Sequence, residues 1–426
     1  MSDIRFEGWL HRSGTGGVYQ DSAGNVGIAS TQPQQKLDIG NGGFQVGPTG
    51  IATVTTINTT NIINATSLSH RNLIINGAMM VAQRGTSSSA GNGYYTVDRM
   101  KFRSGGNDET NTVSQITLNN TDTGPYQKGF RYAYRIQNGN QTGGAGTSDW
   151  SQLEYHPEAQ DLANSGWDYT NSNSFITLSF WIRSSVGQRF YGYMDSIDGT
   201  GQRYSFAIDG GSALSANTWR FVSITIPGNS NLQFDNNTDN GLDIKLVTFY
   251  GTDYTDNSYT MNNWAATGSN YMPDYDSTWY TTNDATWDIT GLQFEVGSEA
   301  TPFEHRSYGD ELRRCQRYYN KVYDVEGQSG EKPFLLGTYL NSSELATVAS
   351  FPKMRGVPSL DVTNGSNKFM IRRDGASDNF DTFTMRYGTS TTAEIYVSSN
   401  VSGTAGQCGI IRGADTDVYI AFSAEL

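Results

Sequence analysis

Two stretches, FITLSFWIR at residues 175–183 and WRFVSITIP at residues 219–227, decide the fold of this chain. In both stretches apolar and polar side chains alternate, and a period of two residues puts the apolar set on one face of an extended strand. β-branched and aromatic residues, which favour pleated backbone, dominate both. Each stretch therefore predicts a strand of an antiparallel sheet, with one face packed inward and the other in contact with water.

The same pattern recurs across residues 71–306. Turn-forming clusters such as DGTGQ, DGGS and DNNTDNG separate the strands, and no helical pattern lies between them. Many short strands joined by glycine-rich turns are typical of an antiparallel sandwich, of which the jelly roll is one form. The remaining clear strands are expected at residues 96–103, 130–137, 203–208, 242–250 and 287–296.

Residues 1–70 differ from this domain, because they are rich in Gly, Asn, Gln and Thr and carry few large apolar side chains. Their apolar residues lie in short extended pieces, at 26–28, 37–39 and 44–46, and β-branched residues and Thr fill 51–68. A single chain has too little apolar surface here to enclose a core. We therefore expect a trimeric N-terminal β-shaft, in which sister chains supply the missing contacts; a disordered linker is the alternative.

Beyond the expected jelly roll, the sequence DELRRCQRYYNK predicts a helix over residues 310–321, inside a hinge region at 307–332. Asp310 could cap the start of this helix, and Leu312, Cys315 and Tyr319 share one stripe at helical spacing. Strand patterns return over residues 333–426 and predict a small C-terminal β-sandwich. The chain as a whole is thus expected to be all-β.

Composition and charge exclude several functions. The formal net charge of −13 argues against nucleic acid as a partner, because that affinity depends on Lys and Arg at phosphates. No run of 18 uninterrupted apolar residues exists, so membrane insertion is not expected. The two cysteines, Cys315 and Cys408, are too few for a disulfide scaffold, and reduced thiols are favoured, although one bridge is left open.

Aromatic residues among polar ones suggest glycan binding at residues 254–287, because sugar rings stack their C–H faces on exposed aromatic rings. The segment lacks strand alternation and is interpreted as a long loop. The candidate glycan-binding residues are Trp264, Tyr271, Tyr275, Trp279 and Tyr280. An equally weighted alternative is that these rings plug the end of the sandwich or the trimer interface. A weaker set, for which packing is favoured, is Trp150, Trp167 and Tyr169.

Catalysis is not expected. A glycosidase needs two carboxylates across the scissile bond, and two pairs, Asp274 with Asp276 and Asp195 with Asp198, are close in sequence. All four lie among turn formers, which explains them without chemistry. We therefore assign no catalytic residues.

No metal or cofactor is expected either. Asp235, Asn237 and Asp239 alternate as in a calcium loop, but the glycine falls one place late, at Gly241. Leu246 then stands where such a loop requires a bidentate Glu.

Three stretches resemble tail fibres and related virion appendage proteins of bacteriophages, particularly those of cyanobacterial phages. They are GWLHRSGTGGVYQDSAGNVGIASTQPQQKLDI at 8–39, RNLIINGAMMVAQRG at 71–85 followed by YYTVDRM at 94–100, and ITGLQFEVGSEATPFEHRSYGDELRRCQRYY at 289–319. The first is similar to a fibre-shaft motif. The second and third look like the opening strand and the closing strand of a jelly-roll module with its following helix.

The resemblance implies a homotrimer in the virion, made in the host cytoplasm, whose N-terminal end is held by tail, baseplate or collar proteins. It also implies a carbohydrate-binding-module-like jelly roll that attaches to host cell-surface polysaccharide. Relatives often hold calcium through an acidic residue after the NG turn, but residues 76–80 of this chain (NGAMM) offer no carboxylate. Two alternatives remain: a polysaccharide-degrading tailspike, and a structural connector or capsid fibre that binds no glycan.

Overall fold

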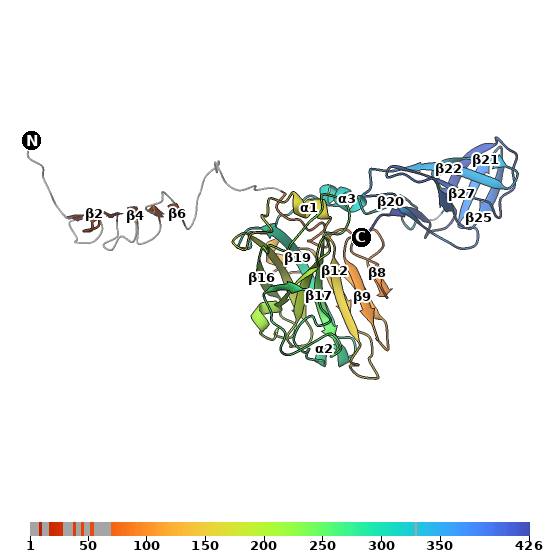
Figure 1. The fold of residues 1–426 in the computed structure, drawn as a ribbon. Coiled ribbons are helices and arrows are strands. Elements are labelled where there is room, and N and C mark those ends of the chain that lie inside the picture. The colour runs from red at the N-terminus through yellow and green to blue at the C-terminus, as the bar shows by residue number, and fades with distance from the viewer. Residues whose placement is uncertain are drawn as a thin grey trace, which may run out of the picture. The chain divides into compact units, whose positions relative to one another are not determined.

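The computed structural model describes residues 8–10, 17–28, 37–39, 44–46, 52–54, 70–328 and 330–426, and the chain divides into two compact units, Met1–Leu68 and Ser69–Leu426. The fold is all-β, as predicted, and is built mainly from antiparallel strand pairs (Figure 1).

The first unit contains one sheet whose six strands follow each other in chain order. The pairing is antiparallel except between β3 and β4. The strands are β1 (Gly8–Leu10), β2 (Gly17–Gln20), β3 (Val26–Ile28), β4 (Leu37–Ile39), β5 (Phe44–Val46) and β6 (Ala52–Val54). The three extended pieces expected at 26–28, 37–39 and 44–46 are therefore confirmed as strands, whereas residues 55–68 lie outside the described residues.

The second unit begins with a β-sandwich of two antiparallel sheets, as expected of a jelly roll. In neighbour order, the first sheet contains β16 (Arg220–Pro227), β13 (Phe175–Ser184), β19 (Thr286–Val296), β11 (Tyr132–Gln137), β10 (Asn111–Thr117) and β7 (Ser87–Ala90). The second sheet contains β18 (Trp264–Ala266), β15 (Gln202–Ala207), β14 (Tyr191–Ser196), β17 (Leu242–Tyr250), β12 (Trp150–Tyr155), β9 (Lys101–Gly105) and β8 (Gly93–Tyr94).

In the two stretches that decide the fold, the apolar side chains lie on one face of each strand, as predicted. On β13 the apolar residues Ile176, Leu178, Phe180 and Ile182 are fully buried between the sheets. Phe180 lies directly opposite Val222 of β16, so both strands give the same face to the core. The intervening side chains lie on the outer face of the first sheet.

Two differences from the predicted strands have physical reasons. The strand expected at 96–103 begins only at Lys101, because residues 96–99 form bends and a turn in which Arg99 takes a left-handed φ of 71°. Strands β12 and β14 were not among those expected. Their polar residues, such as Gln152, Glu154 and Asp195, are buried as deeply as their apolar neighbours, which hides the two-residue period.

The C-terminal part forms a second, smaller sandwich, as predicted. One sheet contains β20 (Tyr319–Asp324), β29 (Tyr419–Ser423) and β23 (Ser359–Val362). The other contains β25 (Ala376–Phe380), β24 (Phe369–Arg373), β28 (Cys408–Gly413), β21 (Lys332–Asn341), β22 (Glu344–Ser350), β27 (Thr392–Val397) and β26 (Thr384–Arg386). Their shared core includes Phe369, Ile395 and Phe422.

The helix between the sandwiches, α3 (Tyr308–Gln316), starts earlier and ends earlier than the predicted 310–321. Ser307 caps it, with its Oγ accepting a hydrogen bond from the Asp310 backbone N–H, so the expected cap at Asp310 is wrong. The helix cannot continue to residue 321, because Tyr319 already begins β20.

The other helical segments are short: α1 (Ala159–Ala163), α2 (Thr278–Thr281), η1 (Tyr126–Lys128) and η2 (Ile208–Gly211). Within the described residues, every helix is too short or too polar to cross a membrane. Cys315 is buried and Cys408 is exposed, and both are free thiols.

Buried ion pairs tie the two sandwiches of the second unit together. Glu158, whose side chain has no exposed surface, accepts hydrogen bonds from Arg317 Nε (2.7 Å) and Arg317 Nη2 (2.7 Å) and from the Tyr318 hydroxyl (2.5 Å). Arg99 is fully buried, pairs with Glu425 and stacks on the Tyr318 ring at 3.5 Å. Burial alone would raise the pKa of Glu158, but these hydrogen bonds hold it below its usual range.

We expect Glu158→Gln to lower the free energy of unfolding by about 2–3 kcal/mol at neutral pH, because Arg317 loses its buried partner. Since the folded-state pKa is lowered, this stabilisation is complete above the ordinary carboxyl value of 4.5 and is lost as the pH falls through the folded-state value. Chemical denaturation at several pH values between roughly 3 and 7, a range that spans the titration of carboxyl groups, measures this stabilisation. Arg189→Gln, which breaks the exposed pair with Asp276, is the control. Equal effects of both changes at every pH would contradict the assignment.

Candidate functional site

The aromatic rings predicted to bind glycan lie mostly inside the protein. Trp279 and Tyr280 sit on α2 and have no exposed surface. The Trp279 Nε1–H donates to the carbonyl of Thr286 (3.1 Å), and the Tyr280 ring stacks on Phe249 at 4.3 Å. Trp264 is 7% exposed, and its Nε1–H donates to the carbonyl of Pro227 (2.7 Å). These three rings have no face free for a sugar, so they plug the sandwich, and their assignment as glycan-binding residues is corrected.

Tyr271 and Tyr275 are half-buried and lie together on the outer face of the second sheet. Tyr275 packs edge-on against Tyr191 and donates its hydroxyl to the carbonyl of Val247 (2.6 Å). Tyr271 is covered by the guanidinium of Arg203 at 3.8 Å. Packing also explains the weaker set of candidates. Trp167 is a core residue and Tyr169 packs against that core, whereas Trp150 is half-buried beside the cluster that contains Tyr191, Tyr193 and Tyr250.

A different group of rings lines a cleft of about 480 Å³ on the outer face of the first sheet, which we call the aromatic cleft. Its floor is formed by Ser179, Trp181, Phe221 and Gly291, and its walls by Lys128 and Phe130 on one side and residues 300–305 on the other. Its volume falls within the roughly 300–1,000 Å³ that is usual for small-ligand sites.

The floor follows directly from strand register. Trp181 of β13 and Phe221 of β16 are directly opposite each other in the antiparallel pair, and both point away from the core. Their ring centroids are 5.4 Å apart at an interplanar angle of 53°. Trp181 is half-buried and Phe221 is 43% exposed. Two adjacent cross-strand rings thus present apolar surface to solvent.

The first wall, at residues 118–131, is held by Asp122. Its carboxylate accepts hydrogen bonds from Arg183 (2.7 Å), from the indole of Trp219 (3.1 Å) and from the backbone of Asn119 (2.9 Å). Burial raises the pKa of Asp122, but these hydrogen bonds and the charge of Arg183 outweigh it and lower the pKa overall.

This wall lies directly on the Trp181 ring. A Cβ at Gly124, where φ is 104°, would lie 2.5 Å from the ring, so glycine is required there on both counts.

The second wall is fixed by polar residues of β19. Glu295 accepts hydrogen bonds from the backbone N–H (2.8 Å) and the hydroxyl (2.5 Å) of Thr301. Gln293 accepts from the backbone N–H of Glu304 (2.8 Å). Phe303 packs edge-on against Phe130 of the first wall, with centroids 4.8 Å apart. The walls are therefore joined at one end of the cleft.

Polar groups stand among these rings. His305 is exposed, and its Nε2 lies 2.8 Å from the carbonyl of Lys128. Because a carbonyl only accepts, Nε2 carries a proton and donates it to this hydrogen bond. The Lys128 ammonium and the hydroxyls of Ser179 and Thr301 supply further hydrogen-bonding groups. Such a combination suits a polyhydroxylated ligand with apolar C–H faces.

The sequence contained a signal for this site. Trp181 in FITLSFWIR occupies a position that the alternation assigns to the outer face, and a large ring is unusual there. Only the register between β13 and β16, which the sequence does not state, shows that Phe221 lies beside it.

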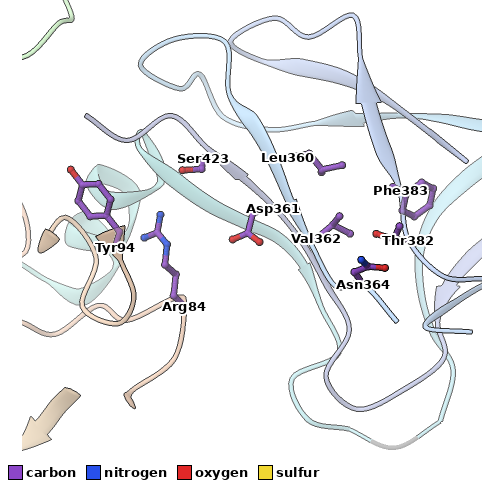
Figure 2. Close-up of a pocket in the computed structure, with 9 residues that line it drawn as sticks. All are labelled: Arg84, Tyr94, Leu360, Asp361, Val362, Asn364, Thr382, Phe383 and Ser423. Atoms are coloured by element: carbon purple, nitrogen blue, oxygen red, sulfur yellow. The ribbon is translucent and has the colours of Figure 1, made fainter. Parts of the chain in front are cut away.

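A second pocket, of about 610 Å³, lies between the two sandwiches of the second unit (Figure 2). Figure 2 shows Arg84 and Tyr94 from the first sandwich facing Asp361 from β23. Arg84 pairs with Glu425 (3.3 Å) and stacks on Tyr319 at 3.5 Å, and Asp361 accepts hydrogen bonds from the hydroxyls of Tyr319 and Tyr419. Arg84 is thus engaged between the two sandwiches, and Asp361 is engaged by tyrosines of its own sheet, so structural contacts account for both charged groups of this pocket.

The paired aspartates are engaged in structural contacts. Asp195 forms a bidentate pair with Arg203 (2.7 and 2.9 Å), and Asp276 pairs with Arg189 (3.3 Å). Asp274 accepts hydrogen bonds from Thr255 and Asn257, both at 2.6 Å. Asp198 accepts one from the backbone of Asp235 (2.9 Å).

Across the described residues, no cluster of three His, Cys, Asp or Glu side chains is arranged to hold a metal ion.

Comparisons with known proteins return structures only, since no protein-family model and no curated protein matches the chain. The chain is similar to the enzymatically active domain of tailspike protein 4 from bacteriophage CBA120, with 8% identity over 53% of this chain and 21% of that chain and a TM-score of 0.28. It is also similar to the tandem CBM22-1–CBM22-2 domain of Paenibacillus barcinonensis Xyn10C, with 12% identity, 85% and 100% coverage and a TM-score of 0.26. The TmCBM61 module in complex with β-1,4-galactotriose gives 9% identity, 54% and 99% coverage and a TM-score of 0.24. At these values the similarities carry no argument about function.

Trp279 is fully buried and Trp181 is half-buried, so their removal should lower the free energy of unfolding by different amounts. We expect Trp279→Ala to lower the free energy of unfolding by about 3–5 kcal/mol, because it empties a fully buried site. Trp181→Ala should cost about 1–2 kcal/mol, since part of that ring already contacts water. Chemical denaturation of both variants measures the difference. A Trp279→Ala protein as stable as the Trp181→Ala protein would show that the plug assignment is wrong.

Proposed function

We propose that this chain is an adhesion protein that binds a glycan in the aromatic cleft and acts by binding, without catalysis. The observation that carries the proposal is the pair formed by Trp181 and Phe221, which offers adjacent apolar ring faces on the floor of a cleft. Sugar rings present C–H faces to such surfaces, and the polar groups of Lys128, Ser179 and His305 that line the cleft suit sugar hydroxyls.

The cleft is held in a fixed shape, which supports its proposed role in glycan binding. Both walls are held by buried side chains, Asp122 on one side and Gln293 and Glu295 on the other. A preformed site loses little conformational entropy when a ligand enters, which favours recognition by a few weak contacts.

We further propose that three chains assemble as a tail fibre or a related appendage of a bacteriophage virion, with the first unit as the shaft. The sequence resemblance supports the setting. Surface exposure in the first unit supports the assembly, because Val18 and Ile28, directly opposite each other on β2 and β3, are 42% and 39% exposed in the single chain. Sister chains would cover such residues. Three weak glycan sites on one fibre would then act together by avidity.

Glycan binding is tested with Trp181→Ala and Phe221→Ala. We expect each change to weaken binding to host-envelope polysaccharide by about tenfold or more, because a stacking surface is lost. Trp150→Ala is the matched control, since Trp150 is also a half-buried strand tryptophan but lies on the second sheet.

Binding is measured by calorimetry on extracted polysaccharide and by a glycan array. Unchanged affinity in both cleft variants would refute the cleft as the site. Release of reducing sugar ends by the wild-type protein would refute the non-catalytic part of the proposal.

The trimer is tested separately on the full chain. Analytical ultracentrifugation should give three times the chain mass of 46.7 kDa at micromolar concentration. Val18→Asp combined with Ile28→Asp should lower the fraction of trimer, because charge replaces the apolar surface that sister chains cover. A monomeric wild-type protein would contradict the assembly.

A further inference from the structure

A further pocket adjoins the aromatic cleft at His305. It has a volume of about 520 Å³, and His305 lines both spaces. Because Arg306, Arg313 and Arg314 also line it, we call it the arginine pocket. The two spaces are therefore adjacent, and a ligand that occupied both would have to be longer than one sugar.

The arginine pocket has an excess of positive charge. Its carboxylates are Glu304 and Asp310, against three guanidinium groups. Glu304 accepts hydrogen bonds from the backbone N–H of Asn72 (2.8 Å) and from Arg306 (3.1 Å). Asp310 accepts one from the Ser307 hydroxyl (2.6 Å). Both carboxylates are thus engaged by donors within the protein.

The cations differ in how far the protein engages them. Arg306, with 8% of its side chain exposed, pairs with Glu304 and Glu311 and donates to the carbonyl of Ile74 (3.1 Å), and only its buried Nε has no hydrogen-bond partner among the described residues. Arg314 Nη2 lies 2.8 Å from His70 Nδ1, and because a guanidinium only donates, this ring nitrogen accepts there. Arg313 is exposed. The N-terminus of α3 begins in the same pocket, and its backbone dipole also favours negative charge.

We propose that the glycan bound in the aromatic cleft is acidic, and that a carboxylate or sulfate group on a neighbouring sugar is held in the arginine pocket by Arg313 and Arg314. This inference rests on the proposed glycan binding and adds the chemical class of the ligand. Guanidinium groups suit it because they donate paired hydrogen bonds to a planar carboxylate or to a sulfate.

The net charge of −13 does not oppose this assignment. At physiological salt the interactions of exposed charges are largely screened beyond about 8 Å, so the groups at the pocket decide the local preference.

The test is a glycan array that carries uronic-acid oligosaccharides beside their carboxyl-reduced forms, and sulfated oligosaccharides beside their desulfated forms. Each pair keeps the sugar backbone and changes only the charge. Four full-length proteins are compared: wild type, Arg313→Gln/Arg314→Gln, Trp181→Ala, and a charge-matched control, Lys353→Gln/Arg372→Gln. Both control residues are exposed cations of the C-terminal sandwich.

We expect the wild type to bind one acidic class at least tenfold more tightly than its neutral form. The double arginine variant should lose that preference while keeping its affinity for the neutral form, and the control should keep both. Trp181→Ala should lose affinity for both members of a pair. Which pair responds tells carboxylate from sulfate.

The inference is overturned if the wild type binds charged and neutral forms equally, or if the double arginine variant keeps the acidic preference. In either case, loss of binding in Trp181→Ala would still support the aromatic cleft as the glycan site, and only the acidic preference would be refuted. Wild-type binding in Trp181→Ala, together with wild-type binding in Phe221→Ala, overturns both proposals.

Discussion

The structure of the first sandwich depends on strand β19, which is buried on both faces, with apolar side chains on one face and polar side chains on the other. On the inner face Trp287, Ile289 and Phe294 are fully buried between the sheets. On the outer face Asp288, Thr290, Gln293 and Glu295 are buried too, although their side chains are polar. Buried polar groups are tolerated only when they are hydrogen-bonded, so neighbouring strands and loops must supply partners on this face. Strands β11 and β13 partner Asp288 and Thr290, and the second cleft wall partners Gln293 and Glu295.

Each outer residue of β19 has a defined role in that arrangement. Asp288 accepts hydrogen bonds from Arg135 and Arg183, and Arg183 in turn reaches Asp122 in the first wall. Gln293 and Glu295 fix the second wall. Where β19 carries Gly291, with φ at 67°, the Phe130 ring takes the space of the missing side chain; a Cβ there would lie 2.7 Å from it. The cleft is thus the part of the outer face that the loops leave open.

This double role explains how much could be predicted from the sequence. The period of two residues in β13 and β16 identified the strands, the all-β class and the core, because that signal is local. The site was predicted in the wrong place, because ring content alone does not distinguish Trp279, which fills the end of the sandwich, from Trp181, which faces solvent. The distinction depends on register and on which loops cover which face, and both are long-range. Polar strands such as β12 were not predicted for the same reason, since tertiary contacts bury Gln152 and Glu154 and the local sequence does not indicate this.

The two pockets also differ in how they can contribute to recognition. In the proposed binding mode, stacking on Trp181 and Phe221 is available to many sugars, because most pyranose rings have a C–H face, so this part would supply affinity with little selectivity. A guanidinium pair with one anionic group depends on its position along the glycan, and it fails when that group is missing. His305 lines both spaces and donates to the carbonyl of Lys128, and the segment that carries it leads directly into α3, so the fold sets the spacing from stacking surface to charge. Selectivity for an acidic glycan would then come from this spacing, while assembly of several chains would raise an affinity that one shallow cleft cannot supply.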